Sequence, residues 1–248
     1  MKVKFFSFNE DQNKIIDAIL AHNKDFVAVE NNYELVVVIG GDGTFLHALN
    51  FFKHEDVKIV LINNGKLGFF SNINDDYKIE LDDSKFASYP ILNLSCEHHR
   101  LSAMNEFILI AQNNPIKFDV LLNDHYWYTS FGSGFMVSTK NGSSGVNRSL
   151  RGPLLTNDNQ FIYQEYLPVI SSQTISVLQP VVFNYGDELK FKIHDPENNT
   201  LSIKVDGVLT NWSDLKLKIH LTKSIAKIYH LNNQEWINRI NQKMLGEK

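Results

Sequence analysis

This chain of 248 residues is poor in cysteine, in long apolar runs and in clustered basic charge, and each lack excludes a class of protein. Its one cysteine, Cys96, cannot form an internal disulfide and has no partner at metal-ligand spacing along the sequence. No apolar run approaches the ~20 residues that span a bilayer, and the start MKVKFFSFNE turns polar too soon for a signal peptide. With a net charge of −4 and no basic block, nothing indicates a nucleic-acid surface. We therefore expect a cytoplasmic protein with neither a membrane nor a nucleic acid as partner.

What the chain does contain changes in character near residue 90. Before that point, strand-like segments alternate with helical patterns, the strands at 3–8, 34–39 and 57–62 and the helices at 9–23 and 44–52. The second and third strands show no polar alternation, which is typical of parallel strands covered on both faces. This order predicts a right-handed parallel α/β sheet of Rossmann-like type.

The second half of the chain has a different pattern of apolar and polar residues. Short segments, many of them alternating apolar and polar residues, are separated by Asn-Asp, Asp-Gly and Pro-Glu-Asn-Asn turns. This pattern is typical of a β-sandwich or an open barrel. Residues 234–245 form a helical pattern with one apolar face, made of Trp236, Ile237, Ile240 and Met244. We expect an α/β domain at 1–90, a β-sandwich at 91–230 and a terminal helix within 231–248 that docks back on the body.

The first candidate site is the segment VVVIGGDGTF, residues 36–45, where a covered strand runs into three glycines and one carboxylate. The bare amides of Gly40, Gly41, Gly43 and Thr44 at a helix N-terminus are suited to phosphate oxygens, and open α/β sheets bind ligands at this edge. The alternative is that Asp42 caps the helix and the glycines only turn the chain. Neither a Walker A loop nor a Gly-x-Gly-x-x-Gly fingerprint is present.

A second glycine loop, NNGKLGFF at 63–70, follows the next strand and is expected at the same edge of the sheet. Alone, it is equally well explained as an ordinary turn. Together, the two loops predict a ligand crevice at the carboxyl ends of the strands.

The motifs GGDGTFLHA, NNGKLGF, MNEF (104–107), GSGFMVSTKNGSSG (132–145), RGP (151–153) and VDG (205–207) follow one another in an order that resembles the NAD kinase family. The resemblance extends over about residues 35–230. It implies an α/β domain, a β-sandwich domain, an active site in the cleft between them, and homodimers or homotetramers. It also implies phosphorylation of NAD at the adenosine-ribose 2′-hydroxyl, with ATP or polyphosphate as the donor and magnesium or another divalent metal.

The resemblance and the chemistry of the side chains together assign roles. Asp42 is the expected general base, because it is short and is placed among glycines that hold phosphate. Asn105 suits an adenine edge and Glu106 suits two ribose hydroxyls, although both residues could simply be solvated. No metal ligand is assigned to the protein. The residues expected to bind NAD are Asp42, Gly43, His47, Asn105, Glu106, Ser133, Ser144, Gly145, Val146, Ser149 and Asp206.

Two of these residues have plainer alternatives. His47 could be a solvated residue of the helix surface. Asp206 with Gly207 is first of all a hairpin turn, as Asp-Gly pairs usually are, while the family resemblance places this aspartate at the donor side.

The loop at 140–146 departs from the family pattern. Lys140 and Asn141 stand where Pro and Thr are usual, Val146 replaces a tyrosine that would stack on a base, and Phe131 and Ser133 replace charged residues. These changes keep two further hypotheses open. One is a non-catalytic nucleotide-binding descendant of the fold, and the other is a lipid or sugar kinase that shares the Gly-Gly-Asp-Gly motif.

Overall fold

The computed structural model describes residues 1–8, 12–63, 70, 77–79, 81–170, 175–194, 196, 199–229 and 233–245. The chain divides into two compact units, a first unit of Met1–Tyr89 with Ser224–Lys248 and a second unit of Pro90–Lys223. Two long strands, β5 (Phe86–Ser95) and β15 (Lys216–Tyr229), contribute residues to both units. Among the described residues, no helix combines the length and the apolar character that crossing a membrane requires.

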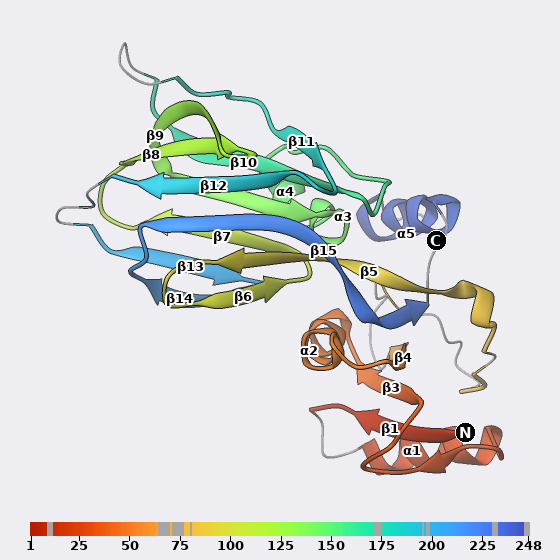
Figure 1. The fold of residues 1–248 in the computed structure, drawn as a ribbon. Coiled ribbons are helices and arrows are strands. Elements are labelled where there is room, and N and C mark those ends of the chain that lie inside the picture. Colours follow the sequence, from red (N-terminus) through yellow and green to blue (C-terminus); the bar gives the residue numbers. More distant parts are fainter. Residues whose placement is uncertain are drawn as a thin grey trace. The chain divides into compact units, whose positions relative to one another are not determined.

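The first unit contains a parallel sheet (Figure 1). Its strands lie in the order β2 (Val27–Ala28), β1 (Lys2–Phe6), β3 (Leu35–Gly40), β4 (Lys58–Asn63), and the end of β15 pairs in parallel with β4. The chain leaves β1 toward β2 and returns on the other side of β1 as β3. This reversal of direction is the kind of point at which open α/β sheets bind ligands, beyond the carboxyl ends of the strands.

Both faces of this sheet are covered, as the unbroken apolar strands predicted. On one face, Ile19 of α1 (Asn13–His22) packs in a core with Leu35, Val37 and Val60. The intervening residues of β3 are equally buried, because successive side chains of a strand point to opposite faces. A second helix, α2 (Asp42–Phe52), buries its apolar stripe of Phe45, Ala48, Leu49 and Phe52.

The terminal helix α5 (Asn233–Leu245) belongs to the first unit. Trp236 and Ile240, one turn apart, are buried in a cluster with Phe70. Ile237, which the sequence placed on the same apolar face, is 38% exposed, so that face is narrower than expected.

The second unit is built from antiparallel strands that enclose one core (Figure 1). Its main path runs β14 (Val208–Trp212), β13 (Leu201–Val205), β7 (Glu106–Ala111), β9 (His125–Thr139), β8 (Ile116–Leu122), β12 (Glu188–Ile193) and β15. On side branches, β10 (Gln160–Pro168) pairs with β9 and β11 (Val181–Asn184), while β5 pairs with β15 and β6 (Arg100–Ala103). The described residues also include the short helices η2 (Asp83–Lys85) in the first unit, and α3 (Lys140–Ser143) and α4 (Val146–Ser149) in the second.

Alternating side chains fill this second core. In β8, Ile116, Phe118 and Val120 are buried and the residues between them are more exposed. Phe135 of β9 stacks on Phe191 of β12 with ring centroids 3.8 Å apart. A parallel α/β unit and an antiparallel β unit, with a terminal helix, confirm the fold class that the sequence predicted.

Candidate functional site

The turn from β3 into α2 places Asp42 as the first residue of the helix. Gly41 is the N-cap, in an extended conformation (φ −92°, ψ −175°), and no side chain bonds to the cap. Helix α2 therefore begins two residues before the expected Thr44, and Asp42 is not the capping residue. Capping alone does not account for this carboxylate.

The glycines of this loop fall into two kinds. Gly40 has φ +155°, and a Cβ there would lie 2.6 Å from Thr44 Oγ1, so the fold itself requires glycine at this position. At Gly41 and Gly43, which are both exposed, a Cβ would meet nothing within 4 Å in the described structure. The described residues therefore leave room for a side chain at these two positions, whereas close approach of a phosphate to the backbone amides would require glycine.

The Asp42 carboxylate is half-buried, and a backbone amide orients it. Its Oδ1 accepts a hydrogen bond from the backbone N–H of Phe70 at 3.3 Å. Phe70 packs against Phe45 of α2, with ring centroids 5.2 Å apart, and against the buried face of α5. The apolar contacts of α5 thereby fix the amide that orients Asp42.

Helix α5 also brings a cation close to Asp42. Burial lowers the pKa of the Arg239 guanidinium, and the charges of Glu235 and Asp42 act in the opposite direction. Sequence reasoning missed this residue, because Arg239 is 197 positions from Asp42 and its helix has the pattern of an ordinary amphipathic segment. Its partly buried charge lies within electrostatic reach of both acidic side chains.

His47 lies on the exposed side of α2. Its ring packs edge-to-face on Phe8, with centroids 5.2 Å apart. The second glycine loop lies outside the described residues from 64 to 69, and only its flanking residues Asn63 and Phe70 are described.

In the second unit, Asn105 lies in the turn between β6 and β7, and Glu106 is the first residue of β7. The Asp206 carboxylate accepts hydrogen bonds from three consecutive backbone amides, those of Met104 (2.8 Å), Asn105 (2.7 Å) and Glu106 (3.2 Å). Asp206 itself lies with Gly207 in the two-residue hairpin between β13 and β14, and both residues have positive φ. The Asp-Gly turn expected from the sequence is present, and its side chain also shapes the Asn105–Glu106 turn.

Glu106 is an unusual carboxylic acid. It is only 4% exposed, and its Oε2 has no hydrogen-bond partner among the described residues. Burial, together with the charge of Asp206, raises the pKa of Glu106 to about 7, and Lys204 opposes this shift. Buried polar atoms normally have partners, so this oxygen is suited to a ligand that donates hydrogen bonds.

The loop after β9 packs onto the same turn. The Thr139 hydroxyl donates to the Met104 carbonyl at 2.5 Å, and the Thr139 N–H donates to the Asn105 carbonyl at 2.8 Å. A Cβ at Gly142 would collide with the Asn105 carbonyl, so glycine is required here for close approach. The segments around 105 and 140, predicted separately, are therefore one packed assembly in the second unit.

The unusual residues of this loop have structural partners. Lys140 is buried, and its Nζ lies 3.2 Å from Asp158 Oδ1. Asn147 is buried and donates to the carbonyls of Ser143 (3.2 Å) and Pro153 (2.8 Å). Val146 is half-buried at the start of α4.

The remaining predicted residues divide by position. Ser144 is half-buried, while Gly145 and Ser149 are exposed on the same loop. Ser133 is not brought to this assembly, because it lies on β9 six residues before Thr139, about 20 Å along an extended strand.

Comparison with known proteins gives three kinds of similarity. A family model for the ATP-NAD kinase N-terminal domain matches residues 2–83. The chain is 30% identical over 250 residues to an NAD kinase of Ureaplasma parvum serovar 3, an alignment that covers 95% of this chain and 90% of that protein. It is 28% identical over 200 residues to an NAD kinase of Mycoplasma genitalium, with 78% and 77% covered.

Two solved structures share the fold. An NAD kinase from Archaeoglobus fulgidus in complex with ATP superposes with a TM-score of 0.75 at 18% identity, covering 97% of this chain and 99% of that chain. Yeast NADH kinase complexed with NADH superposes with a TM-score of 0.75 at 16% identity, covering 99% and 87%. At these identities, the two structures support the fold alone.

Proposed function

The chain belongs to the NAD kinase family, and we propose that it transfers a phosphoryl group from ATP or polyphosphate to the adenosine-ribose 2′-hydroxyl of NAD, giving NADP. It is accordingly a phosphotransferase. The proposal assigns Asp42 as the general base, the amides around it to phosphate, and Asn105 and Glu106 to the nucleoside of NAD.

The observation that carries the choice of acceptor is the unsatisfied oxygen of Glu106. A buried carboxylate with no donor costs free energy, and vicinal ribose hydroxyls supply two donors at the spacing of one carboxylate. Asn105, next to it, offers both a donor and an acceptor for an adenine edge. Because Asp206 bonds three amides of this turn, both side chains are presented from a rigid backbone.

The surroundings of Asp42 support its role as base. Phosphoryl transfer needs an acceptor oxygen in line with the phosphorus, removal of its proton, and neutralisation of charge on the transferred group. Asp42 is a short acid whose orientation is fixed by the Phe70 amide, and the open amides of Gly41 and Gly43 precede and follow it. One turn of chain thus offers both a proton acceptor and donors for phosphate.

A divalent cation fits this donor set. Mg²⁺ usually takes one or two carboxylates together with substrate phosphates and water, and Asp42 is the acidic residue in the first turn of α2. When bound, the cation would neutralise charge on the donor phosphates. The loop amides would hold and orient the donor phosphates there, and Asp42 would accept the proton of the acceptor hydroxyl.

The relatives suggest which phosphoryl donor and which form of the dinucleotide acceptor to test. The Archaeoglobus protein was solved with ATP and the yeast protein with NADH. We therefore propose ATP as the first donor to test, polyphosphate as the second, and NADH as an alternative acceptor.

One alternative has a specific observation in its favour. Val146 presents no aromatic ring to a base, and Lys140, buried and paired with the half-buried Asp158, stands in place of the proline of the family pattern. A chain with these changes could bind a nucleotide without turnover. A third possibility, a kinase of another acceptor, requires turnover with an alcohol other than NAD.

Incubation of the purified chain with NAD, ATP and Mg²⁺ tests all three. Formation of NADP supports the proposal, nucleotide binding without turnover supports the non-catalytic alternative, and turnover only with another alcohol supports the third. The decisive variant is Asp42→Asn, which removes the base and keeps the shape. Its kcat should fall by about 10²–10⁴-fold.

Two further measurements separate catalysis from structure in this variant. Melting temperature and calorimetric NAD affinity should stay near the wild-type values, because the N-cap is Gly41 and not Asp42. Asp17→Asn, on the exposed side of α1, is the matched control and should leave kcat unchanged. Wild-type turnover in Asp42→Asn would rule Asp42 out as the base, and unfolding would assign it a structural role.

We propose further that the chain forms a homodimer or homotetramer. Leu167 (67% exposed), Ile170 (72%) and Ile175 (69%) are apolar side chains exposed near one another in the sequence, and a contiguous patch of such side chains would mark a subunit interface. Ile170→Asp should shift the mass measured by light scattering to that of the monomer. A monomeric wild-type chain would overturn this proposal. The cytoplasmic setting stays a prediction for cell fractionation.

A further inference from the structure

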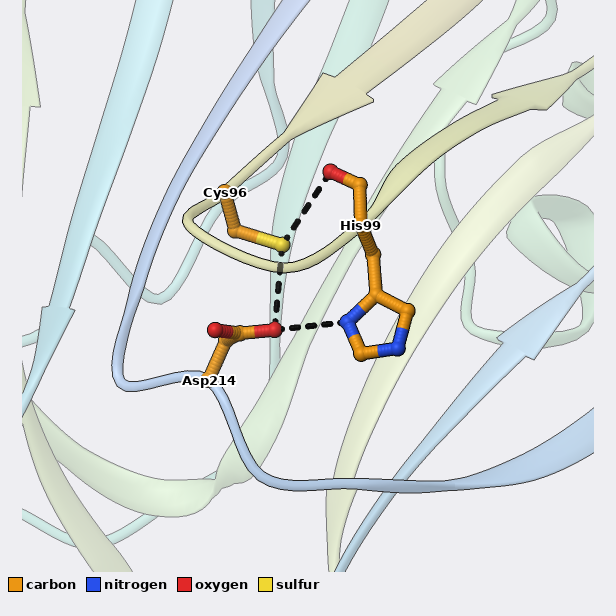
Figure 2. Close-up of side chains that lie close together, drawn as sticks. All are labelled: Cys96, His99 and Asp214. Carbon is orange, nitrogen blue, oxygen red and sulfur yellow. Dashed lines mark hydrogen bonds and ion pairs between the residues drawn. The ribbon is translucent and has the colours of Figure 1, made fainter.

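A cluster of three potential metal ligands lies in the second unit, apart from the Asn105–Glu106 turn (Figure 2). Cys96 Sγ lies 3.2 Å and His99 Nδ1 lies 2.7 Å from the same oxygen, Asp214 Oδ2. The three ligand atoms are all within 4.8 Å of one another. Spacing along the sequence indicated no metal-ligand partner for Cys96, whereas the fold brings Asp214, 118 residues further along the chain, to within hydrogen-bond distance of it.

The fold holds each member of the cluster in place. Cys96 and His99 are the ends of the tight turn between β5 and β6, in which the Cys96 N–H donates to the His99 carbonyl at 3.1 Å. The Asp214 carbonyl accepts from Trp212 Nε1 at 2.8 Å, and the His99 ring packs on the Trp212 ring with centroids 5.1 Å apart. The Asp214 side chain is 4% exposed. The three metal-ligating atoms are therefore already close together without a bound metal.

The order of the hydrogen bonds excludes a nucleophilic triad. In such a triad the imidazole lies between the nucleophile and the acid, so that it can remove the proton of the nucleophile. Here the carboxylate lies between the other two groups. The imidazole donates to it, and the thiol has it as one of two acceptors, the other being the His99 carbonyl at 3.3 Å (Figure 2). The same buried oxygen is thus an acceptor for both the imidazole and the thiol, and one cation bound there could replace both protons.

We propose that Cys96, His99 and Asp214 bind a zinc ion, with His98 as the fourth ligand. Sulfur, imidazole nitrogen and carboxylate oxygen together are the donor set of zinc sites. His98 Nε2 lies 4.0 Å from Asp214 Oδ1, on an exposed side chain that is free to turn inward. Tetrahedral zinc with ordinary bond lengths sets its ligand atoms about 3.3–3.7 Å apart, so the pairs now at 2.7 and 3.2 Å open by a few tenths of an ångström.

Zinc binding displaces two protons from their present positions. The thiol releases its proton to the buffer and binds as the thiolate, and the His99 proton moves through solvent from Nδ1 to Nε2, leaving the Nδ1 lone pair for the metal. Asp214 binds through the oxygen that had accepted both hydrogen bonds. The resulting site links the β5–β6 turn to the segment before β15.

The test uses the full chain, freed of metal with a chelator and then titrated with cobalt(II) chloride or zinc(II) chloride. Cobalt bound by Cys96 should give a sulfur-to-cobalt charge-transfer band in the near ultraviolet, and zinc should displace it at one ion per chain. Because Cys96 is the one cysteine of the chain, this band reports on the proposed site and needs no variant. A wild-type chain that takes up cobalt without the band overturns the proposal.

Variants of the proposed ligands test their contribution to zinc affinity. Cys96→Ser and Asp214→Asn should weaken zinc affinity by more than the roughly 10–100-fold that loss of an outer-shell partner costs. The matched control is His194→Gln, which breaks another histidine–aspartate pair of the same unit, His194 Nε2 to Asp119 Oδ1 at 2.8 Å, and should bind zinc like the wild type. Wild-type zinc affinity in Cys96→Ser, or equal weakening in His194→Gln, would also contradict the site.

Discussion

Replacement of Glu106 by glutamine should change how the stability of the chain depends on pH. Burial and the charge of Asp206 raise the pKa of Glu106 from the ordinary 4.5 to about 7 in the folded chain. Between these two values, the folded chain keeps a proton that the unfolded chain has released. The protonated carboxyl therefore contributes its full stability below about pH 4.5, and this contribution is lost as the pH rises through about 7.

The size of the effect follows from the shift. The rise of the Glu106 pKa from 4.5 to about 7 corresponds to about 3 kcal/mol of unfolding free energy. Glu106→Gln stays neutral at every pH. Urea unfolding of both proteins from about pH 4 to about pH 8 should therefore show the variant gaining about 3 kcal/mol relative to the wild type.

Glu188 provides a control of opposite sign. Although burial alone would raise its pKa, the ammonium groups of Lys218 and Lys190 lower it. Its contribution is present above the ordinary pKa of 4.5 and is lost as the pH falls. Glu188→Gln should therefore lose stability relative to the wild type as the pH rises. A stability difference for Glu106→Gln that does not change with pH would refute the reasoning about its burial.

NAD binding provides a second way to measure the ionisation of Glu106. Ribose hydroxyls that donate to the ionised Glu106 favour its charged form, so NAD binding should lower the pKa and release a proton near neutral pH. Calorimetry in buffers of different ionisation enthalpy measures that proton. Binding without proton release, or unchanged NAD affinity in Glu106→Gln, would place the ribose elsewhere.

Two further predictions concern the loop packed on the Asn105 turn. Val146→Tyr restores an aromatic platform worth about 1–3 kcal/mol per stacked base, so KM for NAD should fall more than kcat rises, and an unchanged KM would show that the loop takes another path. Gly142→Ala forces a Cβ into the Asn105 carbonyl and should cost about 1–3 kcal/mol in urea unfolding, whereas Gly145→Ala, whose Cβ would lie 3.4 Å from the Gly142 carbonyl, should cost much less. Equal costs at the two glycines would contradict the packing.

The parts of the fold that local patterns encode could be predicted from the sequence. The uninterrupted apolar residues of β3 predicted a strand buried on both faces, and Leu35–Ile39 are buried. The start of α2 was placed two residues late, because glycine at position 41 can cap a helix as well as turn the chain. Such errors arise where one residue type serves two local structures.

The long-range contacts of the site could not be predicted from the sequence. Asp206 was recognisable as a hairpin residue, but its bonds to the amides of 104–106 depend on the pairing of β13 with β7. Lys140 looked like a departure from a pattern, and its burial beside Asp158 depends on how the loop folds. In both cases the partner lies far enough along the chain that no spacing rule reports it.

The two neighbouring carboxylates of the second unit show how the fold separates structure from function. Asp206 accepts three backbone hydrogen bonds, so a ligand that took those acceptors would loosen the turn that it needed. Glu106 is buried beside that charge with an oxygen that lacks a partner, which lowers the stability of the free chain at neutral pH. A buried carboxylic acid without a partner lowers the stability of a residue position that serves only the core. At a binding position the ligand supplies the missing hydrogen-bond donors, and binding recovers the lost free energy. We infer that Asp206 positions the turn and that Glu106 contacts the nucleoside.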